Sequence, residues 1–183
     1  MVEPLWSDLC GQIRRKRARH LQAWSQWRWH LDEVFVRING KTHYLWRAVD
    51  HEGEVLEAYV NKRRNRKAAL RFLRKAMKRY GRPETIVIDK LGSYRAALRT
   101  LGNAACQETG RWLNNRAENS HQPLRRRERA MQRFRQTRTL QKFAAIHSSV
   151  HNHVNQERHL YSRQNFKLNR AAALAEWREL SAA

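Results

Sequence analysis

Cysteines, long apolar runs and acidic residues are all scarce in this 183-residue sequence. Only two cysteines occur, Cys10 and Cys106, and their wide separation excludes a disulfide framework and a thiolate zinc site. No apolar run approaches the roughly 18 residues of a membrane span. The opening Met-Val-Glu-Pro-Leu-Trp has none of the features of a signal peptide. We therefore expect a soluble, cytoplasmic chain with no membrane partner.

The shortage of acids leaves a large excess of positive charge. The sequence has 38 Lys+Arg against 16 Asp+Glu, a formal net charge of +22, which predicts a polyanionic partner such as nucleic acid. A disordered basic tail would contain few aromatic residues, whereas this sequence contains seven Trp and 41% apolar residues. With no repeats or low-complexity linkers, the length predicts one folded domain with a substantial core.

The first half of the chain has the pattern of a sheet followed by a helix. Alternating residues from 30 to 38, the Asn39-Gly40 turn and further strand patterns at 42–49 and 55–60 predict an antiparallel meander. Apolar residues at helical spacing then continue until Gly81, and the short apolar run 85–88 is typical of a buried central strand.

Helical patterns dominate the second half of the chain. We predict helices over 93–101, from Asn114 to 129 with a kink at Pro123, and in two C-terminal segments, and a weaker basic helix over 7–23. Residues 103–113 have too little periodicity for an assignment. This order predicts an α/β fold with a mixed sheet flanked by helices and a helical C-terminal extension.

Three carboxylates stand out against the positive charge. Asp32 shares a strand face with Val34 and Val36, where an unpaired carboxylate is costly, so it needs a cation. Asp89 directly follows the predicted central strand, where open α/β sheets place ligands, and Glu118 lies on the basic helix. Together they supply the hard oxygen ligands that magnesium prefers.

Each carboxylate also has a simpler interpretation. An Asp at the start of a strand is most often a solvated edge charge, and the nearby Gly92 and Ser93 are compatible with a turn formed by Asp89. For a single Glu among many arginines, an ion pair within the helix, with Arg125 or its neighbours, is the first choice for Glu118.

Four long blocks of sequence are more specific than the three acids. They are Trp-Arg-Trp-His-Leu-Asp-Glu-Val-Phe-Val-Arg-Ile-Asn-Gly-Lys (27–41), Tyr-Leu-Trp-Arg-Ala-Val-Asp (44–50), Asn-Asn-Arg-Ala-Glu-Asn-Ser-His-Gln-Pro-Leu-Arg-Arg-Arg-Glu-Arg (114–129) and His-Asn-His-Val-Asn-Gln-Glu-Arg-His-Leu (151–160). In these blocks the chain closely resembles bacterial transposases of the insertion-sequence-six family. That family belongs to the Asp-Asp-Glu transposases and integrases, which have a ribonuclease-H-like core. The resemblance covers about residues 12 to 180.

The resemblance implies a catalytic triad of Asp32, Asp89 and Glu118. It implies two Mg²⁺ ions, with Mn²⁺ as a plausible substitute, of which Asp32 bridges both while Asp89 and Glu118 each hold one. One ion would activate the attacking oxygen and the other would stabilise the leaving 3′-oxygen. The implied reaction is nicking of double-stranded DNA at terminal inverted repeats and transfer of the 3′-ends into target DNA, typically with formation of a cointegrate.

The basic helix is the predicted DNA-contacting element. Arg125, two turns after Glu118, matches the family position of a basic residue that could hold a phosphate near the metals. The density of arginines without balancing acids predicts a surface that follows the phosphate backbone. The predicted DNA-binding residues are Arg116, Arg125, Arg126, Arg127, Arg129 and Arg133.

We divide the chain into a basic N-terminal remnant or linker (1–26), a catalytic core (27–135) and a helical extension (136–183). Full-length relatives carry a helix-turn-helix region ahead of the core, which we expect to be absent here. Two alternatives remain: an inactive, truncated DNA-binding remnant, and a ribonuclease-H-like nuclease without strand transfer. Pairing of two DNA ends predicts a homodimer or higher assembly, associated with the bacterial nucleoid.

Overall fold

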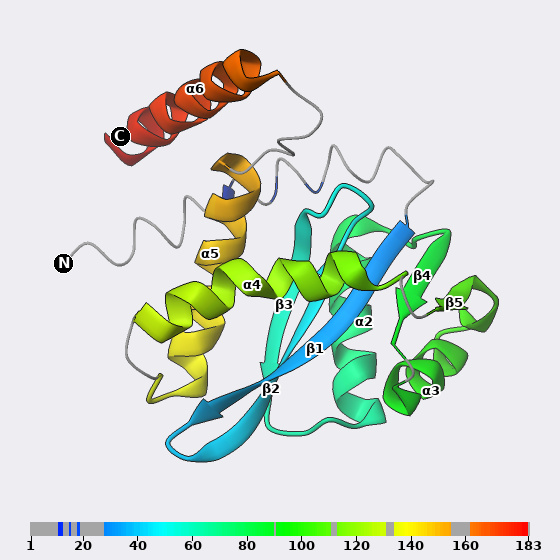
Figure 1. The fold of residues 1–183 in the computed structure, drawn as a ribbon. Coiled ribbons are helices and arrows are strands. Elements are labelled where there is room, and N and C mark those ends of the chain that lie inside the picture. Colours follow the sequence, from blue (N-terminus) through cyan, green and yellow to red (C-terminus); the bar gives the residue numbers. More distant parts are fainter. Residues whose placement is uncertain are drawn as a thin grey trace.

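The computed structural model describes residues 11, 12, 15, 18, 28–89, 91–110, 113–130, 134–154 and 162–182. Its centre is a five-stranded sheet with strand order β3-β2-β1-β4-β5 (Figure 1). The strands are β1 (Arg28–Ile38), β2 (Lys41–Val49), β3 (Val55–Asn61), β4 (Thr85–Ile88) and β5 (Gln107–Thr109). The helices are α2 (Arg66–Tyr80), α3 (Gly92–Thr100), η1 (Ala104–Cys106), α4 (Asn115–Ala130), α5 (Thr137–Val154) and α6 (Arg163–Ala182).

The predicted antiparallel meander is confirmed. β1 pairs with β2 and β2 with β3, both antiparallel. Asn39 and Gly40 have φ angles of 49° and 75°, as the two-residue hairpin turn that joins β1 to β2 requires. In this register Asp32 lies directly opposite Arg47, so the two side chains project from the same face of the sheet.

The parallel half of the sheet is short. β4 pairs with β1 only from Arg28 to Leu31, and Leu31 lies opposite Ile88. The next residue of each strand is therefore an acid, Asp32 on one strand and Asp89 after the other. β5 is a three-residue strand parallel to β4, within residues 103–113, whose pattern predicted neither a helix nor a strand.

Alternation along β1 separates two cores on opposite faces of the sheet. Trp29 and Leu31 belong to the core that also contains residues of α2 and α3, such as Phe72 and Tyr94. Val36 and Ile38 belong to the core that α4 and α5 cover. Figure 1 shows α2 behind the sheet and α4 lying across its front. The carboxylates of two consecutive β1 residues, Asp32 and Glu33, therefore start from opposite faces.

The predicted helices that fall on described residues agree with the structure. Asn65 caps α2 by accepting a hydrogen bond from the Ala68 N–H, and Gly81 ends it with φ 84°. Helix α4 runs from Asn115 to Ala130, with Pro123 inside it. Most of the helix predicted over 7–23 lies outside the described residues.

The C-terminal extension is helical, as predicted. α6 packs against α5, where His153 Nε2 lies 3.1 Å from the Ala173 carbonyl oxygen. Asn152 of α5 donates to and accepts from the backbone of Val55, which attaches the extension to β3. In the described part of the chain, no helix combines the length and the apolarity that crossing a membrane requires.

Candidate metal centre

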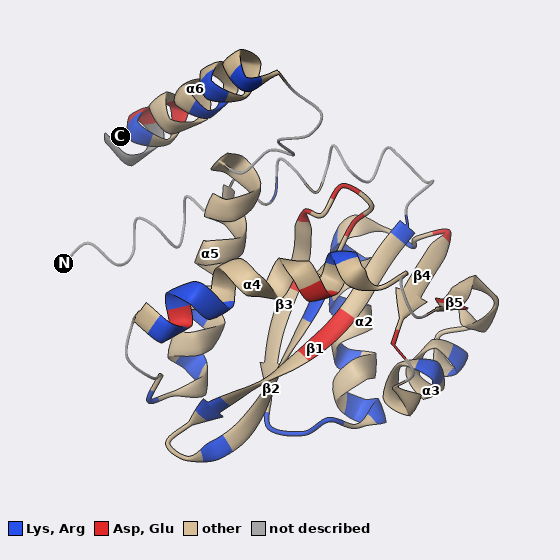
Figure 2. Cartoon of the chain, viewed as in Figure 1, with Lys and Arg blue, Asp and Glu red and all other residues tan. Residues whose placement is uncertain are grey.

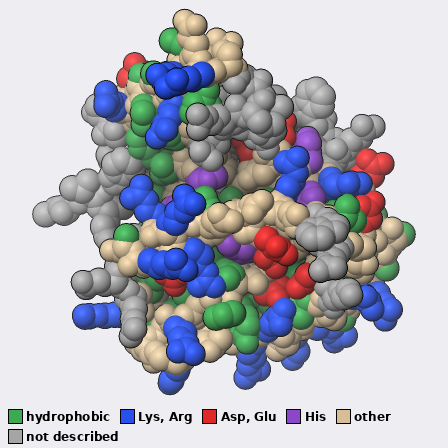
Figure 3. Space-filling view, in the orientation of Figure 1, with side chains coloured by type: hydrophobic (Ala, Val, Ile, Leu, Met, Phe, Trp, Pro, Cys, Tyr) green, Lys and Arg blue, Asp and Glu red, His purple; other side chains and the backbone are tan. Residues whose placement is uncertain are grey.

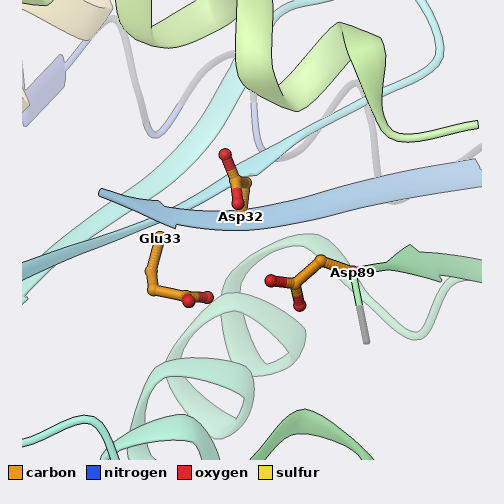
Figure 4. A group of neighbouring side chains, drawn as sticks. All are labelled: Asp32, Glu33 and Asp89. Carbon is orange, nitrogen blue, oxygen red and sulfur yellow. The ribbon is translucent and has the colours of Figure 1, made fainter. Parts of the chain in front are cut away.

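Three carboxylates meet where β1 and β4 run side by side. Asp32 and Glu33 come from β1 and Asp89 from the residue after β4 (Figure 4). One oxygen of each lies within 4.8 Å of the others. Asp32 and Asp89 are thus brought together as the sequence predicted, while the third member is Glu33 rather than Glu118. Such oxygens can hold a hard divalent cation.

Asp32 faces helix α4. Its Oδ2 lies 3.1 Å from Nε2 of the buried His121, and its side chain is 16% exposed. Burial is the main cause that lowers the pKa of His121, so the imidazole is an uncharged neighbour at neutral pH. The cation that the sequence analysis expected beside Asp32 is therefore not this histidine.

Glu33 lies on the other side of β1, and its side chain is only 2% exposed. Burial and the nearby Asp89 raise the pKa of Glu33 to about 7. Arg64, in the connection between β3 and α2, donates from Nε to Glu33 Oε1 at 2.6 Å. Within the described residues, Glu33 Oε2 is buried without a hydrogen-bond partner. This is the least solvated carboxylate of the three.

Asp89 is more exposed, at 35% of its side chain. Its Oδ1 accepts a hydrogen bond from the Leu91 N–H at 3.0 Å, which is the turn-forming role that the sequence also suggested. Burial and the charge of Asp32 raise the pKa of Asp89. The turn leaves Oδ2 directed to the acidic group, 3.8 Å from Arg64 Nη2.

Helix α4 is held along β1 by hydrogen bonds to main-chain oxygens. Asn114, just before the helix, donates to the Leu31 carbonyl at 2.9 Å, and Arg125 donates to the Phe35 carbonyl at 2.9 Å. Between them, the buried Arg47 of β2 donates to the carbonyl of Ser120. These attachments fix the side of α4 that faces Asp32.

Glu118 lies on this attached part of α4. It is exposed, and it precedes His121 by three residues, so the two side chains project from neighbouring positions of one helix side. Arg125, one of the arginines considered as an ion-pair partner of Glu118, has its Nη1 3.4 Å from Glu128 Oε2. The guanidinium of Arg125 also lies 5.5 Å from the centroid of the Phe35 ring.

Five of the six predicted DNA-binding residues lie on α4. Arg116, Arg126, Arg127 and Arg129 are exposed, whereas Arg125 is partly buried and Arg133 lies outside the described residues. Figure 2 shows Lys and Arg on both sides of the acidic segments of β1 and α4. In Figure 3, acidic side chains reach the surface beside histidines, with basic side chains around them. A polyanion approaching the carboxylates would thus meet positive charge first.

Three residues of this site were not predicted from the sequence: Glu33, Arg64 and His121. Glu33 had a usable signal, since it is a carboxylate next to Asp32 that shares its predicted strand face with the apolar Leu31 and Phe35. His121 had a weaker signal, as the residue one turn after Glu118. Nothing in the local sequence distinguishes Arg64 from the exposed arginine beside it.

Comparison with known proteins gives consistent matches. A family model described as a DDE domain matches residues 26–157. Transposases of the elements IS431mec and IS257 from Staphylococcus aureus are 30% identical over 128 residues, 67% of this chain and 55% of theirs. The uncharacterized protein pYV0051 of Yersinia pseudotuberculosis is 37% identical over 76 residues. The chain spans about half the length of the staphylococcal relatives it matches.

Solved integrase cores have the same fold. One such structure is the catalytic core of HTLV-2 integrase in complex with magnesium. The match covers 73% of this chain and 88% of the integrase core, with a TM-score of 0.51 and 13% sequence identity. The catalytic core of BIV integrase has a TM-score of 0.50 and 17% identity over 84% of this chain and 99% of its own. The predicted ribonuclease-H-like mixed sheet is therefore confirmed.

Proposed function

Because the chain belongs to the DDE-domain transposases of the insertion-sequence-six family, we propose that its core nicks DNA at element ends and transfers the 3′-ends into target DNA. The observation that carries the proposal is the meeting of Asp32 and Asp89 at the β1–β4 pairing, inside a basic surface. The family implies a polynucleotidyl transferase, which fits the net charge of +22.

The residues at this place fit a divalent metal. Three carboxylate oxygens within 4.8 Å repel one another, and a divalent cation relieves that repulsion. In our proposal Asp32, Asp89 and Glu118 would hold two Mg²⁺ ions, with Mn²⁺ able to replace magnesium. When bound, the ions supply Lewis-acid activation of the attacking oxygen and stabilisation of the leaving 3′-oxygen.

The protein's own groups orient the carboxylates and the DNA. His121 lies against one oxygen of Asp32 and restricts how that carboxylate can rotate. The hydrogen bond from the Leu91 N–H holds one oxygen of Asp89, and the other oxygen lies 3.8 Å from Arg64 Nη2. Glu118 approaches from α4, whose register along β1 is fixed by Asn114 and Arg125. Each predicted ligand thus comes from a separately attached element.

Arg125 is the proposed phosphate contact beside the site. Its contacts with the backbone and ring of Phe35 order the guanidinium, while about a third of the side chain stays exposed. An ordered arginine can hold a phosphate in a defined position at low entropic cost. The exposed Arg116, Arg126, Arg127 and Arg129 would bind neighbouring phosphates less specifically, and a dimer on DNA would bring two element ends together.

The test is a joining assay with a pre-cut 3′-end from the DNA that flanks the gene, a supercoiled plasmid and Mg²⁺. Wild-type protein should join the two, and Asp32→Asn should not. Glu52→Gln is the matched control, because it also removes one carboxylate but from an exposed turn. Joining by Asp32→Asn at the wild-type rate would contradict the proposal.

The same assay separates the alternatives. Metal-dependent nicking without joining would identify a nuclease. DNA binding without nicking, in wild-type protein that binds Mg²⁺, would identify an inactive remnant.

A further inference from the structure

A basic side chain already lies inside the acidic group. Arg64 contacts Glu33 through both Nε and Nη2, and Nη2 lies 3.8 Å from Asp89 Oδ2. Its planar guanidinium can face two carboxylates at once, which a lysine ammonium does less well. Arg64 therefore bridges a residue of β1 and the residue that follows β4.

The two contacts of Arg64 differ in strength. The Glu33 contact is a charge-assisted hydrogen bond of 2.6 Å to a side chain that is 2% exposed. The Asp89 contact is 3.8 Å long, beyond hydrogen-bonding distance, and its carboxylate is 35% exposed. Water and salt weaken the second contact far more than the first. Arg64 is thus firmly attached to Glu33 and loosely attached to Asp89.

The backbone of Arg64 is fixed while its side chain keeps freedom. Ser93 Oγ lies 3.4 Å from the Arg64 carbonyl oxygen, and the next residue, Asn65, caps α2. The side chain of Arg64 is 43% exposed. The guanidinium can therefore shift away from Asp89 without any change in the fold.

We propose that Arg64 is the positioning residue of the acidic site: it holds Glu33 and Asp89 together without a divalent cation, and it releases Asp89 to that cation while remaining on Glu33. This inference depends on the metal site of the proposed function. Arg64 is a built-in competitor that prevents the carboxylates from repelling each other before the cation arrives.

Competition between Arg64 and the cation for Asp89 predicts a change in both stability and Mn²⁺ affinity. Removing Arg64 should leave the carboxylates without their counter-charge, so the domain should unfold more easily in metal-free buffer and bind Mn²⁺ more tightly. We expect Arg64→Ala to bind Mn²⁺ several-fold more tightly than wild type. The Tm lost by Arg64→Ala in EDTA should be recovered at saturating Mn²⁺.

The adjacent arginine gives a matched control. Arg63→Ala removes the same charge from an exposed neighbouring position and should bind Mn²⁺ like wild type. Arg64→Lys keeps the charge but loses the planar guanidinium, and its Mn²⁺ affinity should lie between those of wild type and Arg64→Ala. In an Asp89→Asn background, removing Arg64 should have little further effect on Mn²⁺ binding, because the carboxylate for which Arg64 and the cation compete is gone.

Mn²⁺ binding by titration calorimetry and unfolding followed by circular dichroism provide the two readouts. If Arg64→Ala does not fold, Arg64→Lys and Arg64→Gln provide the same comparison. Unchanged or weaker Mn²⁺ binding by folded Arg64 variants, or equal effects of Arg63→Ala and Arg64→Ala, would overturn the role of Arg64. Wild-type protein that binds no Mn²⁺ would instead refute the proposed metal function itself.

Discussion

Glu33→Gln should make the stability of the protein less dependent on pH. The side chain is 2% exposed and the pKa of Glu33 is raised from 4.5 to about 7, mainly by burial. A raised pKa means that the folded state binds this proton more tightly than the unfolded state. The stability that the proton contributes is present below the unfolded pKa of 4.5 and is lost as the pH rises through about 7.

The size of the effect follows from the same shift. A difference of about 2.5 pKa units corresponds to roughly 3 kcal/mol, most of it lost between pH 5 and pH 8. A glutamine cannot ionise, and its amide oxygen can still accept from Arg64. Glu33→Gln should therefore be similar in stability to wild type at pH 5 and about 2 to 3 kcal/mol more stable at pH 8.

The free energy of unfolding of both proteins is measured by urea unfolding at 25 °C in EDTA, at pH values from 5 to 8. Other titrating groups contribute to both curves, so the difference between the curves isolates Glu33. Glu52→Gln, which removes an exposed carboxylate, is the control for loss of an acidic side chain at each pH. If Glu33→Gln gives a curve parallel to that of wild type, Glu33 does not titrate differently in the folded and unfolded states, and the reasoning from its burial is refuted.

Further predictions concern activity, DNA binding and the attachment of α4. At saturating DNA, Arg125→Ala should reduce strand joining far more than Arg129→Ala, since Arg125 alone of the two is held against β1; equal losses would make Arg125 one more surface charge. Affinity, measured by fluorescence anisotropy, should fall steeply with salt and distinguish terminal-repeat from random duplex by less than about a hundredfold. Asn114→Ala should cost about 1 to 3 kcal/mol in urea unfolding, because the Leu31 carbonyl loses its buried donor; no change would show that water replaces the amide.

Local patterns were sufficient to predict the sheet and most helices. The Asn39-Gly40 turn and the alternation along β1 define the hairpin by themselves, because both act over a few neighbouring residues. The three-residue β5 was not predicted, since its pairing with β4 is a tertiary contact that leaves no periodicity in so short a segment.

The candidate site was predictable only in part. Asp89 was placed correctly because it follows a buried strand, and the Leu31–Ile88 pairing then brings it to Asp32. Arg64 was unpredictable, because its position depends on how the β3–α2 connection returns to the sheet. Glu118 was singled out as an acid on the basic helix, and the family resemblance gave it a catalytic role. That role stays a prediction, since the described acidic group consists of Asp32, Glu33 and Asp89.

In the hydrogen bonds that attach α4 to β1, the acceptor residues and the donor residues differ in how well they tolerate substitution. Leu31 and Phe35 each accept a hydrogen bond through a main-chain carbonyl, which is present whatever side chain the residue carries. The donors are the side chains of Asn114 and Arg125, so these hydrogen bonds depend on which residue stands at each position. Substitutions of exposed β1 residues can therefore leave these two backbone hydrogen bonds in place, whereas a change in either donor removes one of the bonds that attach the predicted DNA-contacting helix to β1.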